Sequence, residues 1–219
     1  MDITLPDSGQ TLRPGKLICV GKNYARHAAE MGGSVPSEPM LFLKPSTALV
    51  GHGGSIVLPP LSTDVHYEVE LVAVIGRGGK NIAVDNALDY VDGYAVGLDM
   101  TARDLQQKAK EAGAPWSVAK GFDTFAPIGA FVTAREVGDP GRLDIELKVN
   151  GDVKQRGSTQ DMVFSVAEII SYSSRIFTLM PGDLIFTGTP EGVGPVADGD
   201  VLEASATSLP DLRVRVRRG

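Results

Sequence analysis

The stretch YEVELVAVIG, residues 67–76, combines a β-prone apolar run with two carboxylates. Side chains two residues apart in a strand point to the same face, so Glu68 and Glu70 are expected to face the same way. Two neighbouring anions beside apolar residues repel each other and resist desolvation. A bound hard cation that prefers oxygen ligands, Mg²⁺ or Mn²⁺, would compensate the charge of the pair. The alternative is an edge strand whose two glutamates lie in water.

Length and composition predict a globular protein with one substantial core. The chain has 219 residues, of which 42% are hydrophobic and 22% charged, enough for one domain with an ordinary core. Its net charge of −6 argues against a general nucleic-acid binder. No apolar run approaches the ~20 residues of a membrane span, and no signal peptide is recognisable, so we expect no membrane partner and a cytoplasmic location.

Short strands dominate the expected secondary structure, and their order is not the regular alternation of strands and helices. After a weakly paired lead-in over residues 1–16, we expect one domain over residues 17–219 of the strand-dominated α+β class. The expected strands are 17–20, 40–43, 56–58, 68–75, 94–99, 128–132, 145–149, 184–187, 201–204 and 212–216. The expected helices are 25–31, 84–90, 101–112 and 163–178.

Asp99 ends an apolar strand in the sequence GLDM, residues 97–100. An acid at a strand end is well placed to coordinate a metal, and with Glu68 and Glu70 it would complete a three-carboxylate set for an octahedral cation. The alternative is that Asp99 only caps the helix that follows.

His27 and Glu30 lie three residues apart in the expected short helix, and therefore on one face. A carboxylate bonded to an imidazole fixes its tautomer and raises its basicity, which is how such a pair activates water. The glycine- and proline-rich segment 32–39 follows, and it could let the pair close over a site. A solvated helical pair is the alternative.

Two further features suggest contacts to an anion. Lys120 lies among apolar and aromatic residues in PWSVAKGFD, residues 115–123, where it could neutralise an oxyanion or enolate. The turn TGTPEG, residues 187–192, would offer backbone N–H groups and hydroxyls to an anionic ligand. The alternatives are a surface lysine with a partly covered stem and an ordinary loop.

Taken together, these stretches resemble the fumarylacetoacetate hydrolase family, in family order and over most of the chain. The short members, which consist of the catalytic domain alone, are the most similar. The stretches that carry the resemblance are VGKNY (20–24) with His27 and Glu30, LKP (43–45), YEVEL (67–71), GLDMTARDLQ (97–106), AKGFD (119–123) and PGDLIFTGTPEGVG (181–194).

The resemblance implies a mixed β-sandwich roll, a homodimer and a lid at about residues 23–39. It implies that Glu68, Glu70 and Asp99 hold Mg²⁺ or Mn²⁺. Catalytic roles would fall to His27 and Glu30, as the water-activating pair on the lid, and to Lys120 at the substrate. The residues implied to contact the substrate are Arg103, Gln106 and Thr189.

The implied activity is metal-dependent hydrolysis of a C–C bond in acylpyruvates, 2,4-dioxo acids such as fumarylpyruvate, to pyruvate and a carboxylic acid. The implied partner is thus a small 2-oxo acid. Oxaloacetate decarboxylation and a 2-hydroxymuconate-type isomerase or decarboxylase activity are alternatives. A non-enzymatic dimeric scaffold is disfavoured, because every candidate group is present.

Overall fold

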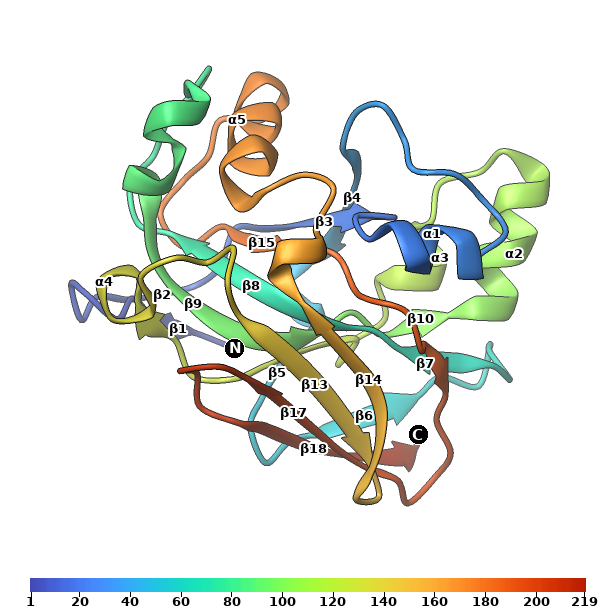
Figure 1. Ribbon diagram of the computed structural model, residues 1–219. Coiled ribbons are helices and arrows are strands. Elements are labelled where there is room, and N and C mark those ends of the chain that lie inside the picture. Colours follow the sequence, from blue (N-terminus) through green and yellow to red (C-terminus); the bar gives the residue numbers. More distant parts are fainter.

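The computed structural model describes residues 1–219, and a large mixed sheet forms its centre (Figure 1). Its strand β15 runs parallel to β3 but antiparallel to β8. In spatial order the strands are β4 (Met40–Pro45), β3 (Lys16–Gly21), β15 (Leu184–Phe186), β8 (Val69–Ile75), β9 (Val91–Leu98), β11 (Ala126–Ile128) and β5 (Leu49–Gly51), with β12 (Val132–Thr133) paired to β9.

A second sheet of five strands packs against the first. Its order is β14 (Asp152–Ser158), β13 (Asp144–Val149), β17 (Val201–Ala206), β18 (Leu212–Arg218) and β6 (Ser55–Leu58). The hairpin between β13 and β14 turns at Asn150 and Gly151, both with positive φ, as the sequence predicts. In β18, Leu212, Val214 and Val216 are buried and the intervening arginines are exposed, so the basic end of the chain is a strand with one solvated face.

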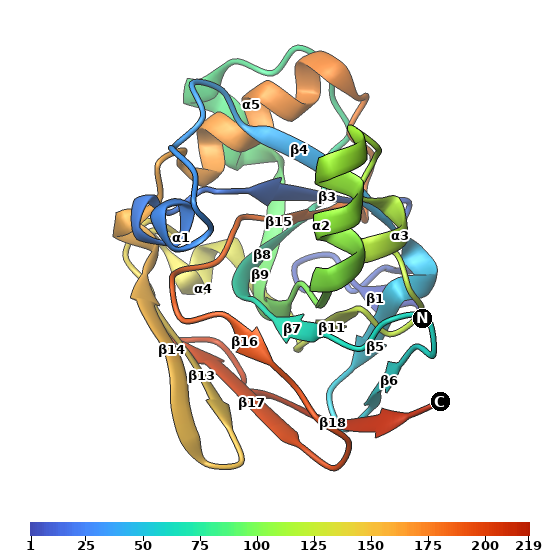
Figure 2. The same cartoon turned by 90° about the vertical axis from the view of Figure 1, so that its right-hand side faces the viewer.

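The remaining elements are short. The helices are α1 (Ala25–Glu30), α2 (Arg103–Ala112), α3 (Ser117–Lys120), α4 (Ala134–Val137) and α5 (Val166–Ile176), with 3₁₀ turns η1 (Ser46–Ala48), η2 (Val84–Tyr90) and η3 (Thr159–Asp161). The short strands are β1 (Ile3–Thr4), β2 (Thr11–Leu12), β7 (Val65–Tyr67), β10 (Thr101–Ala102) and β16 (Gly194–Pro195). Figure 2 shows α1, α2 and α3 on the same side of the molecule.

The large sheet is covered on both faces. Every residue of β8 is buried. Leu71 and Ala73 belong to a core of 35 residues shared with the five-stranded sheet and α5, whereas Val72 and Val74 face a smaller core of 13 residues that includes Ile3 from the N-terminal hairpin. Alternate residues of one strand therefore serve two cores, and Glu70 lies on the same side as Val72.

The structure corrects several predicted boundaries. A single strand over residues 128–132 is wrong: the chain advances four residues from Ile128 to Val132 while β9 advances three, from Gly97 to Tyr94, so the extra residue breaks the pairing. The helix predicted from residue 101 begins at Arg103, because Thr101 and Ala102 pair with β7. The longest helix begins at Val166, after a capping box of Ser165 and Glu168, instead of at residue 163.

The strand-dominated α+β class is confirmed by this architecture. Residues 1–16 contain only the small hairpin of β1 and β2 before β3 begins at Lys16. No helix in the chain combines the length and the apolar character that a membrane crossing requires.

Candidate active and metal site

The register between β8 and β9 brings Asp99 beside the two glutamates. Val69 pairs with Leu98, and one step further the Asp99 N–H donates to the Glu68 carbonyl at 2.8 Å. Carboxylate oxygens of Glu68, Glu70 and Asp99 lie within 4.8 Å of one another, and the three residues are at most 5% exposed. The alternative of two glutamates in water on an edge strand is therefore wrong, since β8 lies between β15 and β9.

Glu70 is held by the turn that follows β15. Its Oε2 accepts a hydrogen bond of 2.8 Å from the Gly188 N–H. Gly188 has a φ of +98°, and a Cβ on it would lie 2.7 Å from Asn23 Cβ, so only glycine fits there. Burial, together with the negative charges of Asp99 and Glu68, raises the pKa of Glu70 well above its usual range. Glu70 makes no ion pair within the chain.

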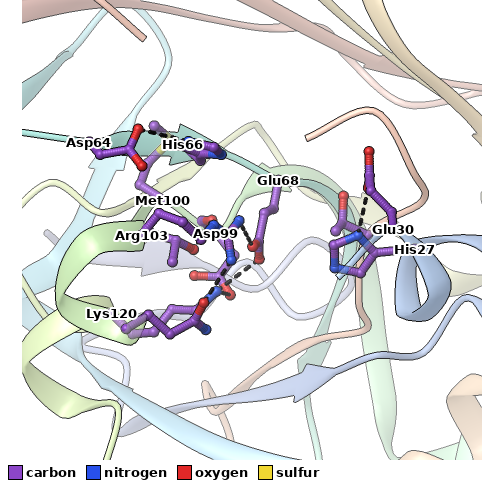
Figure 3. Close-up of polar contacts among 12 residues, drawn as sticks. His27, Glu30, Asp64, His66, Glu68, Asp99, Met100, Arg103 and Lys120 are labelled. Atoms are coloured by element: carbon purple, nitrogen blue, oxygen red, sulfur yellow. Dashed lines mark hydrogen bonds and ion pairs between the residues drawn. The ribbon is translucent and has the colours of Figure 1, made fainter. Parts of the chain in front are cut away.

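Glu68, in contrast, is surrounded by cations. Its Oε2 is 2.8 Å from Lys120 Nζ and its Oε1 is 2.6 Å from an Arg103 guanidinium nitrogen (Figure 3). Burial alone would raise its pKa, but Lys120 and Arg103 outweigh this and hold the pKa well below its usual range. Lys120 also lies 2.6 Å from Asp99 Oδ2. Burial would lower the lysine pKa, but Asp99 and Glu68 keep it raised, so the ammonium form persists.

Lys44 is a residue of this cluster for which sequence reasoning assigned no role. Its buried ammonium group lies 2.6 Å from Asp99 Oδ1 and donates to the carbonyls of Met100, Lys120 and Phe125 at 2.6 to 2.9 Å. Because these carbonyls belong to different segments, Lys44 ties β4 to the chain around Asp99 and to the end of α3. The sequence signals were a lysine directly after the predicted apolar strand 40–43 and its place in LKP, one of the stretches that carry the family resemblance.

His27 and Glu30 form the expected pair on α1. His27 Nδ1 is 3.2 Å from Glu30 Oε2, and Glu30 Oε1 accepts from the Gly192 N–H at 3.0 Å. The helix is anchored at its start by the fully buried Asn23, which exchanges hydrogen bonds with Phe164 and donates to the Thr187 carbonyl. His27 is 5% exposed, so the alternative of a solvated helical pair is wrong for its imidazole.

The three residues with expected substrate contacts are connected to this cluster. Arg103 donates to Gln106 Oε1 at 2.7 Å as well as to Glu68. Thr189 Oγ1 accepts from Gln155 Nε2 at 2.9 Å. Gln155, which the sequence did not indicate, also accepts from the Val69 N–H, and so links β14, β8 and the turn after β15.

A single cavity collects most of these side chains. Its enclosed volume is only about 30 Å³, within about 400 Å³ of space that includes its opening to solvent. All nine expected site residues except Glu30 and Asp99 line it directly, and those two contact lining residues. The lining residues are Val20, Gly21, Lys22, His27, Met31, Phe42, Glu68, Glu70, Arg103, Gln106, Lys110, Trp116, Lys120 and Thr189.

The donor set fits a hard divalent cation. Three carboxylates converge, and Glu70 is the one without a basic partner, although it is buried beside two other anions. A cation at this point would relieve that repulsion, and oxygen ligands suit Mg²⁺ or Mn²⁺ without distinguishing them. Lys120 contacts two of the three carboxylates directly, so it would share oxygens with such an ion.

Comparison with known proteins agrees with this architecture. The family model described as fumarylacetoacetate (FAA) hydrolase C-terminal matches residues 16–217. The protein belongs to the fumarylacetoacetate hydrolase family. This member is 50% identical over 203 residues to the mitochondrial oxaloacetate tautomerase of Arabidopsis thaliana, covering 93% of this chain and 91% of that one.

Solved structures of family members are also similar to this chain. Fumarylpyruvate hydrolase from Pseudomonas aeruginosa, crystallised with Mn²⁺ and pyruvate, superposes with a TM-score of 0.95 at 45% identity, covering all of this chain and 96% of that one. The 5-carboxymethyl-2-hydroxymuconate delta-isomerase of Mycobacterium smegmatis superposes with a TM-score of 0.85 at 38% identity, covering 97% and 86%. The family thus spans hydrolase, tautomerase and isomerase chemistry on one fold.

Removing Glu70 should remove the metal. Glu70→Ala deletes the carboxylate that lacks a cation of its own, so calorimetric titration with Mn²⁺ should show at least a tenfold weaker Kd, since about 1.4 kcal/mol corresponds to tenfold. Glu203→Ala, an exposed change on β17, is the matched control and should bind Mn²⁺ like the parent. Unchanged Mn²⁺ affinity in Glu70→Ala would contradict the carboxylate set.

Removing Lys44 should destabilise the fold. Lys44→Met leaves the buried Asp99 without one ammonium partner and removes the Lys44 donor from three carbonyls, so the free energy of unfolding should fall by about 3–5 kcal/mol. Urea denaturation of the metal-free protein measures this. Lys154→Met, on the exposed side of β14, should change it by less than about 0.5 kcal/mol. Equal stabilities of the two variants would show that Lys44 contributes nothing.

Proposed function

We propose that the protein hydrolyses acylpyruvates, 2,4-dioxo acids such as fumarylpyruvate, to pyruvate and a carboxylic acid. One observation carries the proposal: a buried three-carboxylate cluster, a lysine and a histidine oriented by a carboxylate surround one cavity. The acids would hold Mg²⁺ or Mn²⁺, His27 and Glu30 would activate water, and Lys120 would stabilise negative charge. The crystallised complex of the Pseudomonas aeruginosa fumarylpyruvate hydrolase with Mn²⁺ and pyruvate supports it.

The metal, when bound, would act as a Lewis acid for the 2-oxo acid end of the substrate. Glu30 holds the His27 Nδ1 side, which leaves Nε2 to accept a proton from water. The water oxygen forms a bond to C4 and the C3–C4 bond breaks. The electron pair of the C3–C4 bond remains on the pyruvate fragment and forms its enolate. Lys120 stabilises the negative charge on the enolate oxygen. Protonation at C3 then gives pyruvate, and C4 becomes the new carboxylate.

Substrate orientation would come from Arg103, Gln106 and Thr189. Arg103 and Gln106 lie one turn apart on α2, and Arg103 donates a hydrogen bond to Gln106. This contact holds both side chains in place, so they would present their N–H donors to the substrate in a fixed arrangement. The segment 23–39, which carries His27 and Glu30, would act as a lid over the cavity. A homodimeric assembly and a cytoplasmic location remain predictions.

Oxaloacetate is the second candidate substrate, because relatives about 50% identical to this chain are oxaloacetate tautomerases. The same residues could serve it: His27 can move a proton between C3 and the C2 oxygen without any water attack. Decarboxylation of oxaloacetate, or isomerisation of a 2-hydroxymuconate-type diacid, would use the same enolate-stabilising groups.

A set of turnover assays tests these alternatives. With Mg²⁺ or Mn²⁺, the protein should consume fumarylpyruvate and acetylpyruvate, seen as loss of enol absorbance, and chelation by EDTA should abolish this. Oxaloacetate, assayed for ketonisation and for CO₂ release, separates the tautomerase and decarboxylase alternatives. Turnover of oxaloacetate alone would contradict the hydrolase proposal.

Replacing His27 should separate catalysis from metal binding. His27→Ala should lower kcat for acylpyruvate hydrolysis by roughly 10²–10⁴-fold, the usual contribution of a general base, while Mn²⁺ affinity measured by calorimetry stays within about twofold of the parent. His52→Ala changes an exposed histidine outside the cavity and serves as the control. Unchanged turnover in His27→Ala would exclude its role as the base.

A further inference from the structure

Four lysine and arginine side chains line the cavity, and they fall into two pairs. Arg103 and Lys120 are neutralised by Glu68 and Asp99 at 2.6 to 2.8 Å. Lys22 and Lys110 line the same cavity but make no ion pair. Two lysines that line the cavity, the half-buried Lys22 and the exposed Lys110, therefore have no role in the mechanism above.

Lys22 is held in an uncommon conformation at the end of β3. Its backbone φ is +57°, in the left-handed region that residues other than glycine and asparagine rarely adopt. A Cβ on Gly33 would collide with the Lys22 ammonium group, so the segment after α1 passes directly against it. Lys22 is half-buried and lines the cavity, with its ammonium group beside the backbone of Gly33.

Lys110 reaches the cavity from α2. It follows Arg103 by seven residues and Gln106 by four, so all three lie on one face of the helix and line the cavity together. Its Nζ lies 5.7 Å from the centre of the Trp116 ring, which itself packs against Phe42. Burial lowers the pKa of Lys110, and the positive charges of Arg103 and Lys22 lower it further. Two lysines without acidic partners therefore line one cavity, and an anion bound beside them would relieve their repulsion.

We propose that Lys22 and Lys110 form an anion subsite for the distal carboxylate of a dicarboxylic 2-oxo acid. The inference rests on the proposed function, in which the other end of the substrate lies at Glu68, Glu70 and Asp99. A dicarboxylate would then meet positive charge at both ends of the cavity, from the cation that these three acids would hold and from the two lysines, whereas an acylpyruvate with a neutral acyl group would leave both lysines unpaired. The substrate class is thereby narrowed from acylpyruvates in general to those with a second carboxylate.

The test compares two substrates in the metal-loaded enzyme. Lys22→Met and Lys110→Met should each lower kcat/KM for fumarylpyruvate by on the order of tenfold, as expected for a lost charge-assisted contact of about 1.4 kcal/mol. The value for acetylpyruvate, which lacks the distal carboxylate, should stay within about twofold of the parent. Lys22→Arg and Lys110→Arg should restore most of the loss, because they keep the charge. Lys108→Met, an exposed change on the same helix outside the cavity, is the control.

A binding measurement tests the subsite independently of catalysis. Calorimetric titration of the Mg²⁺-loaded protein with 2-oxopimelate and 2-oxoheptanoate compares two inert 2-oxo acids that differ only in the distal carboxylate. The parent should bind the dicarboxylate more tightly, and both methionine variants should lose that preference. If this preference is found but no acylpyruvate is turned over, the proposed function fails while the subsite stands.

Two results would overturn the subsite. One is equal loss of kcat/KM for fumarylpyruvate and acetylpyruvate in the methionine variants, which would indicate general damage to the cavity. The other is equal affinity of the parent for the two inert acids.

Discussion

Three carboxylates lie within 4.8 Å of one another under almost complete burial, and this constraint governs the surrounding structure. Buried anions are tolerated only when cations and hydrogen-bond donors compensate them. Lys44 and Lys120 therefore reach Asp99, Lys120 and Arg103 reach Glu68, and the Gly188 N–H reaches Glu70. The charge left uncompensated at Glu70 is the one that a divalent cation would balance.

The same compensation connects distant parts of the chain. Lys44 from β4 fixes the carbonyls of Met100, Lys120 and Phe125, and Gln155 from β14 links β8 to the turn that holds Thr189. The side chains that could bind a metal thus lie at the buried centre of the large sheet. The groups proposed to bind and transform the substrate come from short helices and from a turn at the edge of that sheet. A rigid charged centre with separate outer contacts suits a family whose members perform different reactions on related acids.

Hydrolysis, tautomerisation and decarboxylation of 2-oxo acids share the need to stabilise an enolate. The lysine and carboxylate cluster would meet that need in every case, so it would not discriminate among the three reactions. In the proposed mechanisms, the reactions would differ in the use of His27, as the base for water or for a substrate proton, and in the charge at the outer end of the cavity. Specificity would therefore reside in the residues around the carboxylate cluster.

The sequence by itself determined the strand-dominated class, the central strand, the family and the candidate acids, because β-propensity, apolar patterning and short motifs are local properties. The sequence indicated Asp99 as a third acid, but only the pairing of β8 with β9 in the tertiary structure placed it beside Glu68. The tertiary structure also decided that Lys44 and Gln155 support the site, and that Lys22 and Lys110 line the cavity without acidic partners. These relations depend on contacts between segments far apart in the chain, for which neither spacing nor composition carries a signal. The broken strand at residues 128–132 has the same cause, since an extra residue is defined only by the partner strand.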